Sequence, residues 1–301
     1  MDKVVIITGL TASGKSGLAV EIAKKYNGEI ISADSVQIYK GLDIGSAKED
    51  EKIRNQIKHH LIDIKEFYQT YSVGDFVSDC KSAIKDIISR NKLPIIVGGT
   101  GLYIKALLNG YSLGERKSNL EFREKYQEIA KEKGVHSVWE ELNNINPQKA
   151  MTVHENNVKR VIRYLEIEKF GTPDKGDFDN SLTNSYRVLA VGIIANREEI
   201  YQKINNRVDV MIKDGLKKEV ESLVSHGATR DMQAFNSIGY KEWFDCFDGQ
   251  ITEQETIDLI KQHTRNYCKR QLTFLKTING IKLCDSSQAR KEIEDFINDK
   301  N

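Results

Sequence analysis

Short runs of apolar, largely β-branched residues recur along the chain, and each run ends at polar residues or glycine. A continuous apolar run of this length, bounded by turn-forming residues, is typical of a strand buried on both faces. The pattern predicts strands at residues 4–7, 29–32, 93–97 and 187–194, with a shorter candidate at 60–64. Amphipathic stretches at residues 16–26 and 73–90 predict helices between the first strands. Such alternation indicates an α/β fold in which helices flank a parallel, doubly wound sheet.

The middle of the chain lacks this alternation. Residues 115–184 are dominated by helix-forming and charged residues and end in a linker rich in Gly, Asp, Asn and Ser from about residue 171. We expect a helical insertion domain there, and a first domain made of residues 1–114 and 185–301. Three further elements are predicted: long helices at 198–226 and 253–278, and a loop at 37–50.

The residues after the first predicted strand have the spacing of a phosphate-binding loop: Gly9, four residues, Gly14, Lys15 and Ser16. Glycine lets backbone N–H groups face inward, the lysine reaches terminal phosphates, and the serine hydroxyl can ligate Mg²⁺. A helix that begins at the loop adds to the anion site. The pattern identifies phosphate rather than the molecule that carries it. The loop consists of Gly9, Leu10, Thr11, Ala12, Ser13, Gly14, Lys15 and Ser16.

Polar residues follow two other predicted strands, where the carboxyl ends of a parallel sheet face ligands. Asp34 is placed to accept a proton or hold a water on a metal ion, but aspartate there is also a common turn or cap residue. The Thr100 hydroxyl, among three glycines, could donate to a leaving group, although a plain glycine-rich turn explains it almost as well. The Gln37 amide can pair with adenine, yet most glutamines are simply solvated. The residues alone leave these alternatives open.

The overall charge gives no bulk attraction for nucleic acid, because 45 Lys and Arg residues face 44 Asp and Glu residues. RNA contact would therefore need local basic faces. Two candidate clusters are Lys261, Arg265, Lys269 and Arg270, without acidic partners at i,i+4, and Lys159, Arg160 and Arg163. A footprint for RNA phosphates and a solvated helix surface are the two interpretations of each cluster.

The cysteines and the apolar runs limit the compartment. Cys80, Cys246, Cys268 and Cys284 contain no CxxC pair, so we expect neither a zinc site nor a disulfide framework. No apolar run approaches ~18 residues, and the sequence leads directly into a strand, so we expect no membrane span, no signal peptide and a cytoplasmic protein.

Several strings together resemble one family, the tRNA dimethylallyltransferases, also called tRNA isopentenyltransferases. They cover nearly the whole chain in the family's order, and DSVQ followed by GGTGLY and KRQLTF is highly specific. The strings are GLTASGKS, ISADSVQIYKGLDIGSAK, HHLID, YSVGDF, PIIVGGTGLYIKALL, HENNVKRVIRYLEI, SIGYKE and TRNYCKRQLTFLK.

The resemblance implies a P-loop core that transfers the dimethylallyl group from dimethylallyl diphosphate to an adenine of tRNA. The acceptor would be N6 of the adenine on the 3′ side of the anticodon, in tRNAs that read codons beginning with U, and diphosphate would be released. Asp34 matches the family's base, and Thr100 could hydrogen-bond the bridging oxygen. The phosphate loop with Mg²⁺ at Ser16 would stabilise the departing diphosphate. The adenine would have to leave the anticodon-loop stack.

The same resemblance implies contacts with the anticodon stem-loop of tRNA, made by a protein that we expect to be monomeric. Gln271 would lie near this RNA. The matching positions are Asp34, Ser35, Val36, Gln37, Thr100, Arg123, Lys159, Arg160, Val161, Ile162, Arg163, Lys269 and Arg270.

Some positions depart from the family's pattern. The family usually has HPND where residues 154–157 read HENN, and an Ala and a Trp where Cys268 and Phe274 stand. These departures affect the contacts expected there rather than the reaction. The chain ends at Asn301 without the C-terminal zinc finger of larger eukaryotic relatives, as expected of the bacterial form.

Three other functions are weighed against this one. An adenylate isopentenyltransferase would use the same chemistry on free AMP, ADP or ATP, but would not need an insertion carrying Arg123, Arg160 and Arg163. A P-loop small-molecule kinase would leave DSVQ and GGTGLY without a purpose. A non-catalytic RNA-binding module would bind tRNA with a steep salt dependence and leave it unmodified.

Overall fold

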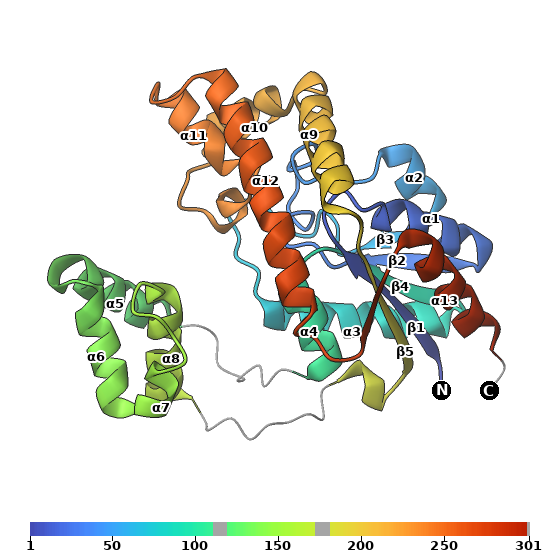
Figure 1. Cartoon of the computed structure of the whole chain (residues 1–301), viewed down its shortest axis with the longest axis horizontal. Helices are drawn as coiled ribbons and strands as arrows, with labels where there is room; N and C mark the ends of the chain where they lie inside the picture. The colour runs from blue at the N-terminus through green and yellow to red at the C-terminus, as the bar shows by residue number, and fades with distance from the viewer. Residues whose placement is uncertain (111–118, 172–180, 300–301) are drawn as a thin grey trace. The chain divides into compact units, whose positions relative to one another are not determined.

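The computed structural model describes residues 1–110, 119–171 and 181–299 (Figure 1). The chain divides into two compact units: Met1–Gly110 with Asn180–Asn301, and Tyr111–Asp179. Most of the predicted linker after residue 171 lies outside the described residues. No helix in the described ranges has the length and apolarity needed to cross a bilayer.

A six-stranded parallel sheet forms the centre of the larger unit, in the order β3-β2-β4-β1-β5-β6. This arrangement confirms the predicted α/β fold. β1 lies in the interior of the sheet, between β4 and β5, so the loop that follows it is surrounded by the ends of other strands. The strands are β1 (Lys3–Gly9), β2 (Gly28–Ser32), β3 (His59–His60), β4 (Leu93–Val97), β5 (Arg187–Ile193) and β6 (Ile281–Cys284).

Helices cover both faces of the sheet, which explains the continuous apolar runs. Val5 and Ile7 of β1 point to one face and Val4 and Ile6 to the other, and all four side chains are fully buried. α1 and α13 pack against the face of Val5, and α3 packs against β2 and β4 from the opposite side. These helices and their neighbour α4 are α1 (Lys15–Lys25), α3 (Val73–Ser89), α4 (Gly101–Asn109) and α13 (Ser286–Asn298).

Further helices complete the larger unit, mainly in the part drawn in yellow to orange (Figure 1). The predicted helix over 198–226 is two helices, because Gly215 has a φ of 99° and separates them. The further helices of the larger unit are α2 (Glu51–Gln56), α9 (Arg197–Lys213), α10 (Leu216–Ser225), α11 (Lys241–Phe247) and α12 (Glu253–Leu275), with 3₁₀ turns at Leu182–Asn184 and Gln233–Asn236.

The predicted strand at 60–64 is also wrong in extent. β3 contains only His59 and His60, because Leu61 and Asp63 have positive φ values of 61° and 55° that an extended strand does not allow.

The smaller unit is helical, without a strand among its described residues. Its helices pack around apolar side chains such as Tyr126, Val138, Leu142 and Leu165. The helices are α5 (Leu120–Lys133), α6 (Val135–Ile145), α7 (Pro147–Ala150) and α8 (Val158–Phe170).

Candidate functional site

A hollow of about 400 Å³ opens beside the carboxyl ends of β1, β2 and β4, at the edge where parallel sheets bind ligands. Its walls come from the phosphate loop, the segment after β2, the loop before α2, and α9. The polar and charged residues of the wall include Thr11, Lys15, Ser16, Ser32, Asp34, Gln37, Glu49, His59, Lys203 and Arg207.

The phosphate loop wraps tightly at the end of β1. Gly9 has a φ of 144°, and a Cβ there would collide with the backbone of Ile193 on β5, so only glycine fits. The Leu10 N–H donates to the Ile193 carbonyl at 3.1 Å, which ties the loop to the sheet. α1 begins at Lys15, so its free N–H groups lie beside the hollow.

The Lys15 ammonium lies within this loop and donates to the Leu10 carbonyl at 3.2 Å. Burial, reinforced by the nearby positive charge of Arg207, lowers the pKa of Lys15 to about 8, and Asp34 partly opposes this effect. An ammonium held in this way gains more from an arriving anion than a lysine in water does.

Asp34 is a turn-forming residue that also lines the hollow. Its Oδ1 accepts the backbone N–H of Val36 at 2.9 Å and that of Gln37 at 3.4 Å, as a turn-forming aspartate does. The same side chain lines the hollow together with Lys15. Its Oδ2 has no hydrogen-bond partner among the described residues, so one oxygen fixes the carboxylate and the other is open to a ligand.

Thr100 connects two loops at this edge. Its hydroxyl oxygen accepts the Ser35 backbone N–H at 3.1 Å, and the hydroxyl lies 3.4 Å from the Ser35 Oγ. Thr100 precedes α4 without a side-chain cap bond, and it is not part of the wall described above. Donation to a leaving group would therefore replace the long contact with Ser35.

Gln37 lines the hollow, but its amide already has partners. Its Oε1 accepts the Ser32 hydroxyl at 2.8 Å, and its Nε2 donates to the carbonyls of Ser46 and Ala47 at 3.3 Å. The predicted pairing with adenine would require these bonds to be exchanged. In this arrangement, Gln37 holds the loop before α2 against the end of β2.

Three charged residues of the wall were not predicted from the sequence: Glu49, Lys203 and Arg207. Burial lowers the pKa of Arg207, while Asp34 and Glu49 counteract this effect. Burial raises the pKa of Glu49, and Arg207 and the Ser16 side chain act in the opposite direction. Lys203 and Arg207 are four residues apart on α9, a spacing that could have indicated a shared basic face.

Gln271 on α12, which the resemblance places near RNA, has partners within the protein. Its side chain is 6% exposed, and its Oε1 accepts the Thr11 N–H at 2.8 Å while its Nε2 donates to the Gly99 carbonyl at 3.0 Å. A Cβ on Gly99 would lie 2.6 Å from that Nε2, so glycine permits the contact. Gln271 thus joins the phosphate loop to the loop before α4.

Gln271→Ala is expected to lower the free energy of unfolding by roughly 1–3 kcal/mol, because the Thr11 N–H and the Gly99 carbonyl lose their partner in a buried place. Urea unfolding followed by circular dichroism measures this change. Gln254→Ala, at an exposed position of the same helix, is the control and should change stability little. Equal effects of the two substitutions would contradict the role of Gln271 in joining the two loops.

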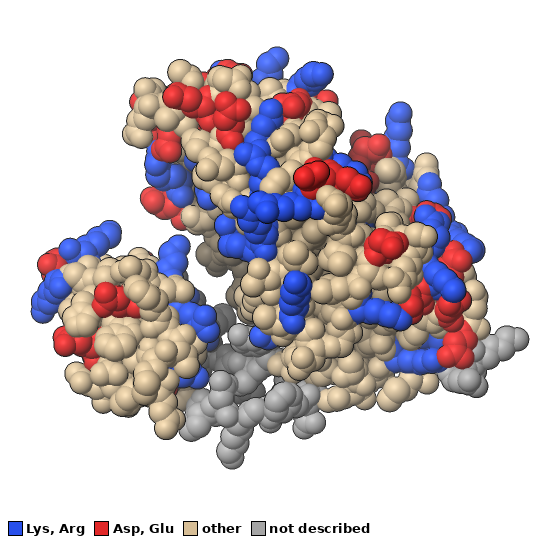
Figure 2. All heavy atoms as spheres, in the orientation of Figure 1, with Lys and Arg blue, Asp and Glu red and all other residues tan. Residues whose placement is uncertain are grey.

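The basic cluster on α12 is only partly free. Lys261 forms an ion pair with Asp209 at 2.6 Å, and Arg265 donates to the Asn205 Oδ1 at 2.7 Å. Both partners lie on α9 and not on α12 itself. Lys269 and Arg270 are exposed. Figure 2 shows Lys and Arg side chains gathered over the region where α12 runs.

In the smaller unit, two of the predicted RNA-binding arginines pair with a buried carboxylate. Arg123 and Arg163 each reach an oxygen of Glu166 at 2.7 Å. Burial would raise the pKa of Glu166, but these hydrogen bonds outweigh it and lower that pKa. Val161 and Ile162 are 0% and 2% exposed, so their side chains belong to the core. Lys159 and Arg160 on the same helix are exposed.

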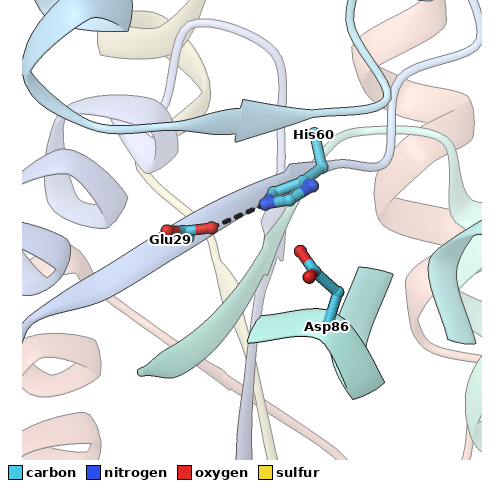
Figure 3. A group of neighbouring side chains, drawn as sticks. All are labelled: Glu29, His60 and Asp86. Atoms are coloured by element: carbon cyan, nitrogen blue, oxygen red, sulfur yellow. Dashed lines mark hydrogen bonds and ion pairs between the residues drawn. The ribbon is translucent and has the colours of Figure 1, made fainter. Parts of the chain in front are cut away.

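One cluster elsewhere has the residue types of a metal centre: Glu29, His60 and Asp86 (Figure 3). The Glu29 carboxylate points to the His60 ring at 2.7 Å, and Asp86 reaches toward the same place from α3. Arg90 and Lys92 also bind Glu29, and the Arg90 guanidinium holds the pKa of Glu29 far below its usual range. Cationic side chains therefore occupy the place of a metal, and we interpret the cluster as structural.

Comparisons with known proteins identify the family of the chain. The sequence pattern of the family described as IPP transferase matches residues 37–278, and that of isopentenyl transferase matches residues 2–67. The tRNA dimethylallyltransferase of Geobacillus thermodenitrificans is 42% identical over 295 residues, which cover 96% of this chain and 92% of that protein.

Two solved structures are also similar. The full-length tRNA isopentenylpyrophosphate transferase of Bacillus halodurans has a TM-score of 0.72 at 38% identity, covering 99% of this chain and 96% of that one. A eukaryotic dimethylallyltransferase, solved while acting on tRNA, has a TM-score of 0.82 at 28% identity, covering 99% of this chain and 80% of its own. The chain belongs to the IPP transferase family.

Proposed function

We propose that the protein transfers the dimethylallyl group from dimethylallyl diphosphate to N6 of an adenine in tRNA, and releases diphosphate. The adenine is the one on the 3′ side of the anticodon in tRNAs that read codons beginning with U. The observation that carries the proposal is that a phosphate-binding loop with Lys15 and a carboxylate with one open oxygen, Asp34, line the same hollow.

The diphosphate end of the donor binds at the phosphate loop. Lys15 and Arg207, with the backbone N–H groups at the start of α1, face the charge that grows on the leaving oxygens as the allylic C1–O bond breaks. Fixed cationic groups in a partly dry site stabilise such charge better than water does. Ile30, Ile62 and Val97 also line the hollow and offer apolar surface to the five-carbon group.

The side chains fit a divalent cation, because oxygen ligands are what Mg²⁺ prefers. The Ser16 hydroxyl is the ligand that the loop pattern supplies, and the Glu49 carboxylate, a second oxygen donor, lines the same hollow. A bound Mg²⁺ would neutralise part of the charge of the diphosphate.

Asp34 receives the proton of the acceptor. The new bond forms between adenine N6 and the allylic carbon, and N6 must lose a proton as it attacks. The open Oδ2 takes that proton, while the bonds to Val36 and Gln37 keep the carboxylate in place. Since a stacked base cannot reach a hollow inside the protein, the adenine must turn out of the anticodon loop.

The loops around Asp34 position both substrates. Thr100 donates to the bridging oxygen once its contact with Ser35 is released. Gln37, which lines the hollow, and its neighbours Ser35 and Val36 contact the base. Lys269 and Arg270 on one unit, and Arg123, Lys159, Arg160 and Arg163 on the helical insertion domain, bind phosphates of the anticodon stem-loop. The protein acts as a cytoplasmic monomer.

Lys269→Ala/Arg270→Ala is expected to raise the KM for tRNA, with little change in affinity for dimethylallyl diphosphate. Each phosphate contact contributes roughly 0.7–0.9 to the slope of log affinity against log salt, so the slope should fall by about one to two. Lys24→Ala/Lys291→Ala removes two exposed charges from α1 and α13 and serves as the control. A KM and a salt slope equal to those of the control would mean that Lys269 and Arg270 are solvated surface residues that do not bind tRNA.

The proposal is tested on tRNA itself. Unmodified tRNA, incubated with the protein, Mg²⁺ and dimethylallyl diphosphate, should yield N6-(dimethylallyl)adenosine after digestion to nucleosides and mass spectrometry. Ribonuclease fragments should place it beside the anticodon. tRNA that is bound but returned unmodified would instead indicate an RNA-binding module.

A further inference from the structure

Phosphate-binding loops of this kind usually hold Mg²⁺ with their Ser or Thr and with an aspartate from another strand of the sheet. In this chain, neither strand beside β1 supplies that aspartate. β4 is followed by Gly98, Gly99 and Thr100, and β5 is followed by Ile194, Ala195 and Asn196. Asp34, which follows β2, also lines the hollow, but the proposed function assigns it to the acceptor, so another carboxylate is needed as the partner of Ser16.

Glu49 lies where such a partner is needed. Its half-buried side chain lines the hollow together with Ser16, whose hydroxyl is near enough to stabilise the charged carboxylate. It also borders a second hollow of about 410 Å³, and Ala47 and Arg207 line both spaces as well. Glu49 thus stands at the wall between the phosphate loop and a neighbouring opening.

The residues on both sides of Glu49 are fixed, so its backbone is held in place. The Lys48 ammonium, whose side chain is 2% exposed, donates to the Tyr39 carbonyl at 2.6 Å and pairs with Asp63 at 2.5 Å. Asp50 caps α2 by accepting the Ile53 N–H at 2.8 Å. A side chain anchored from both neighbours is suited to a binding site that needs defined geometry.

The charges of the hollow also favour a metal. Of the described residues, three cationic side chains and two carboxylates line it: Lys15, Lys203 and Arg207, and Asp34 and Glu49. A fully ionised diphosphate ester carries three negative charges. When it binds beside three positive and two negative side chains, two negative charges remain unbalanced. A divalent cation brings the hollow to neutrality.

We propose that Glu49, together with Ser16, holds the divalent cation that accompanies the diphosphate, through direct ligation or through water on the metal. This inference rests on the proposed function, since it needs a diphosphate substrate. It assigns to a loop residue the part that an aspartate at a strand end plays in other phosphate-binding loops.

Binding of labelled dimethylallyl diphosphate by equilibrium dialysis tests the inference without turnover. The Kd is measured with Mg²⁺ and with EDTA, and their ratio gives the gain due to the metal. Glu49→Gln should reduce this gain by about tenfold or more, the scale of losing a group that orients a bound metal. The Kd in EDTA should stay the same or tighten, because a negative charge beside the diphosphate has been removed.

Controls separate this effect from a structural one. Glu51→Gln makes the same chemical change at an exposed position two residues away and should leave the gain at the wild-type value. Ser16→Ala should lose a similar gain, and the double variant should lose little more, because both residues serve one metal. Circular dichroism checks that each variant is folded.

The contrary outcomes are distinct. An undiminished gain in Glu49→Gln would overturn the inference, and so would an equal loss of affinity in EDTA, which would make Glu49 a scaffold residue. A wild-type protein that binds no dimethylallyl diphosphate in either condition would overturn the proposed function itself.

Discussion

Asp34→Asn is expected to lower kcat by roughly 10²–10⁴, the usual contribution of a positioned general base, while tRNA and dimethylallyl diphosphate still bind. Asparagine keeps an Oδ1 that can accept the N–H groups of Val36 and Gln37, so the turn after β2 should persist. What is lost is the capacity to take the N6 proton. Single-turnover transfer of the labelled dimethylallyl group measures the chemical step directly.

The matched control for this substitution is Asp285→Asn. Asp285 also accepts a backbone N–H, that of Gln288 at 2.9 Å, but it caps α13 and does not line the hollow. The Asp285→Asn variant should have the activity of the wild-type protein. Unchanged turnover in Asp34→Asn would remove Asp34 as the base, and lost binding of both substrates would mean that it acts as a structural residue only.

Lys15→Met is the second large effect, and it should fall on the donor. It retains a long side chain but removes an ammonium whose pKa burial and Arg207 have lowered to about 8. We expect a weaker hold on dimethylallyl diphosphate and a fall in kcat of about 10²–10³, the scale of losing one group that stabilises developing charge. Equilibrium dialysis gives the affinity, and single-turnover kinetics give the rate.

Lys24→Met, at an exposed position of the same helix, controls for the loss of a positive charge. The affinity for tRNA should be almost unchanged in both variants, because the phosphate loop meets the donor rather than the RNA. A wild-type Kd for dimethylallyl diphosphate in Lys15→Met would contradict the role given to the loop.

The fold could be predicted largely from local patterns. β1, the phosphate loop and α1 follow one another within 25 residues, and each has its own signal in the sequence. The predicted bounds were wrong where a single backbone angle ends an element. The positive φ values of Leu61 and Asp63 end β3, and a periodic apolar pattern does not reveal them. In contrast, the break in the long predicted helix had a signal in the sequence, because Gly215 is a residue that weakens a helix.

The site was harder to predict because its contacts join distant residues. Gln271 meets Thr11 across 260 positions, and Arg123 meets Glu166 across 43. The spacing of residues along the sequence does not indicate either pairing. In the sequence, a polar residue that stabilises the fold therefore cannot be distinguished from one that binds RNA. Glu49 and Arg207 were missed for the same reason, since only the folded chain brings them to the phosphate loop.

The most direct test of the central claim is a competition between acceptors. The protein is incubated with Mg²⁺, labelled dimethylallyl diphosphate, and equal concentrations of unmodified tRNA and AMP. The account predicts that the label enters tRNA, at the adenine beside the anticodon, and that Asp34→Asn abolishes nearly all of it. Label in AMP, or label in neither acceptor, would contradict it.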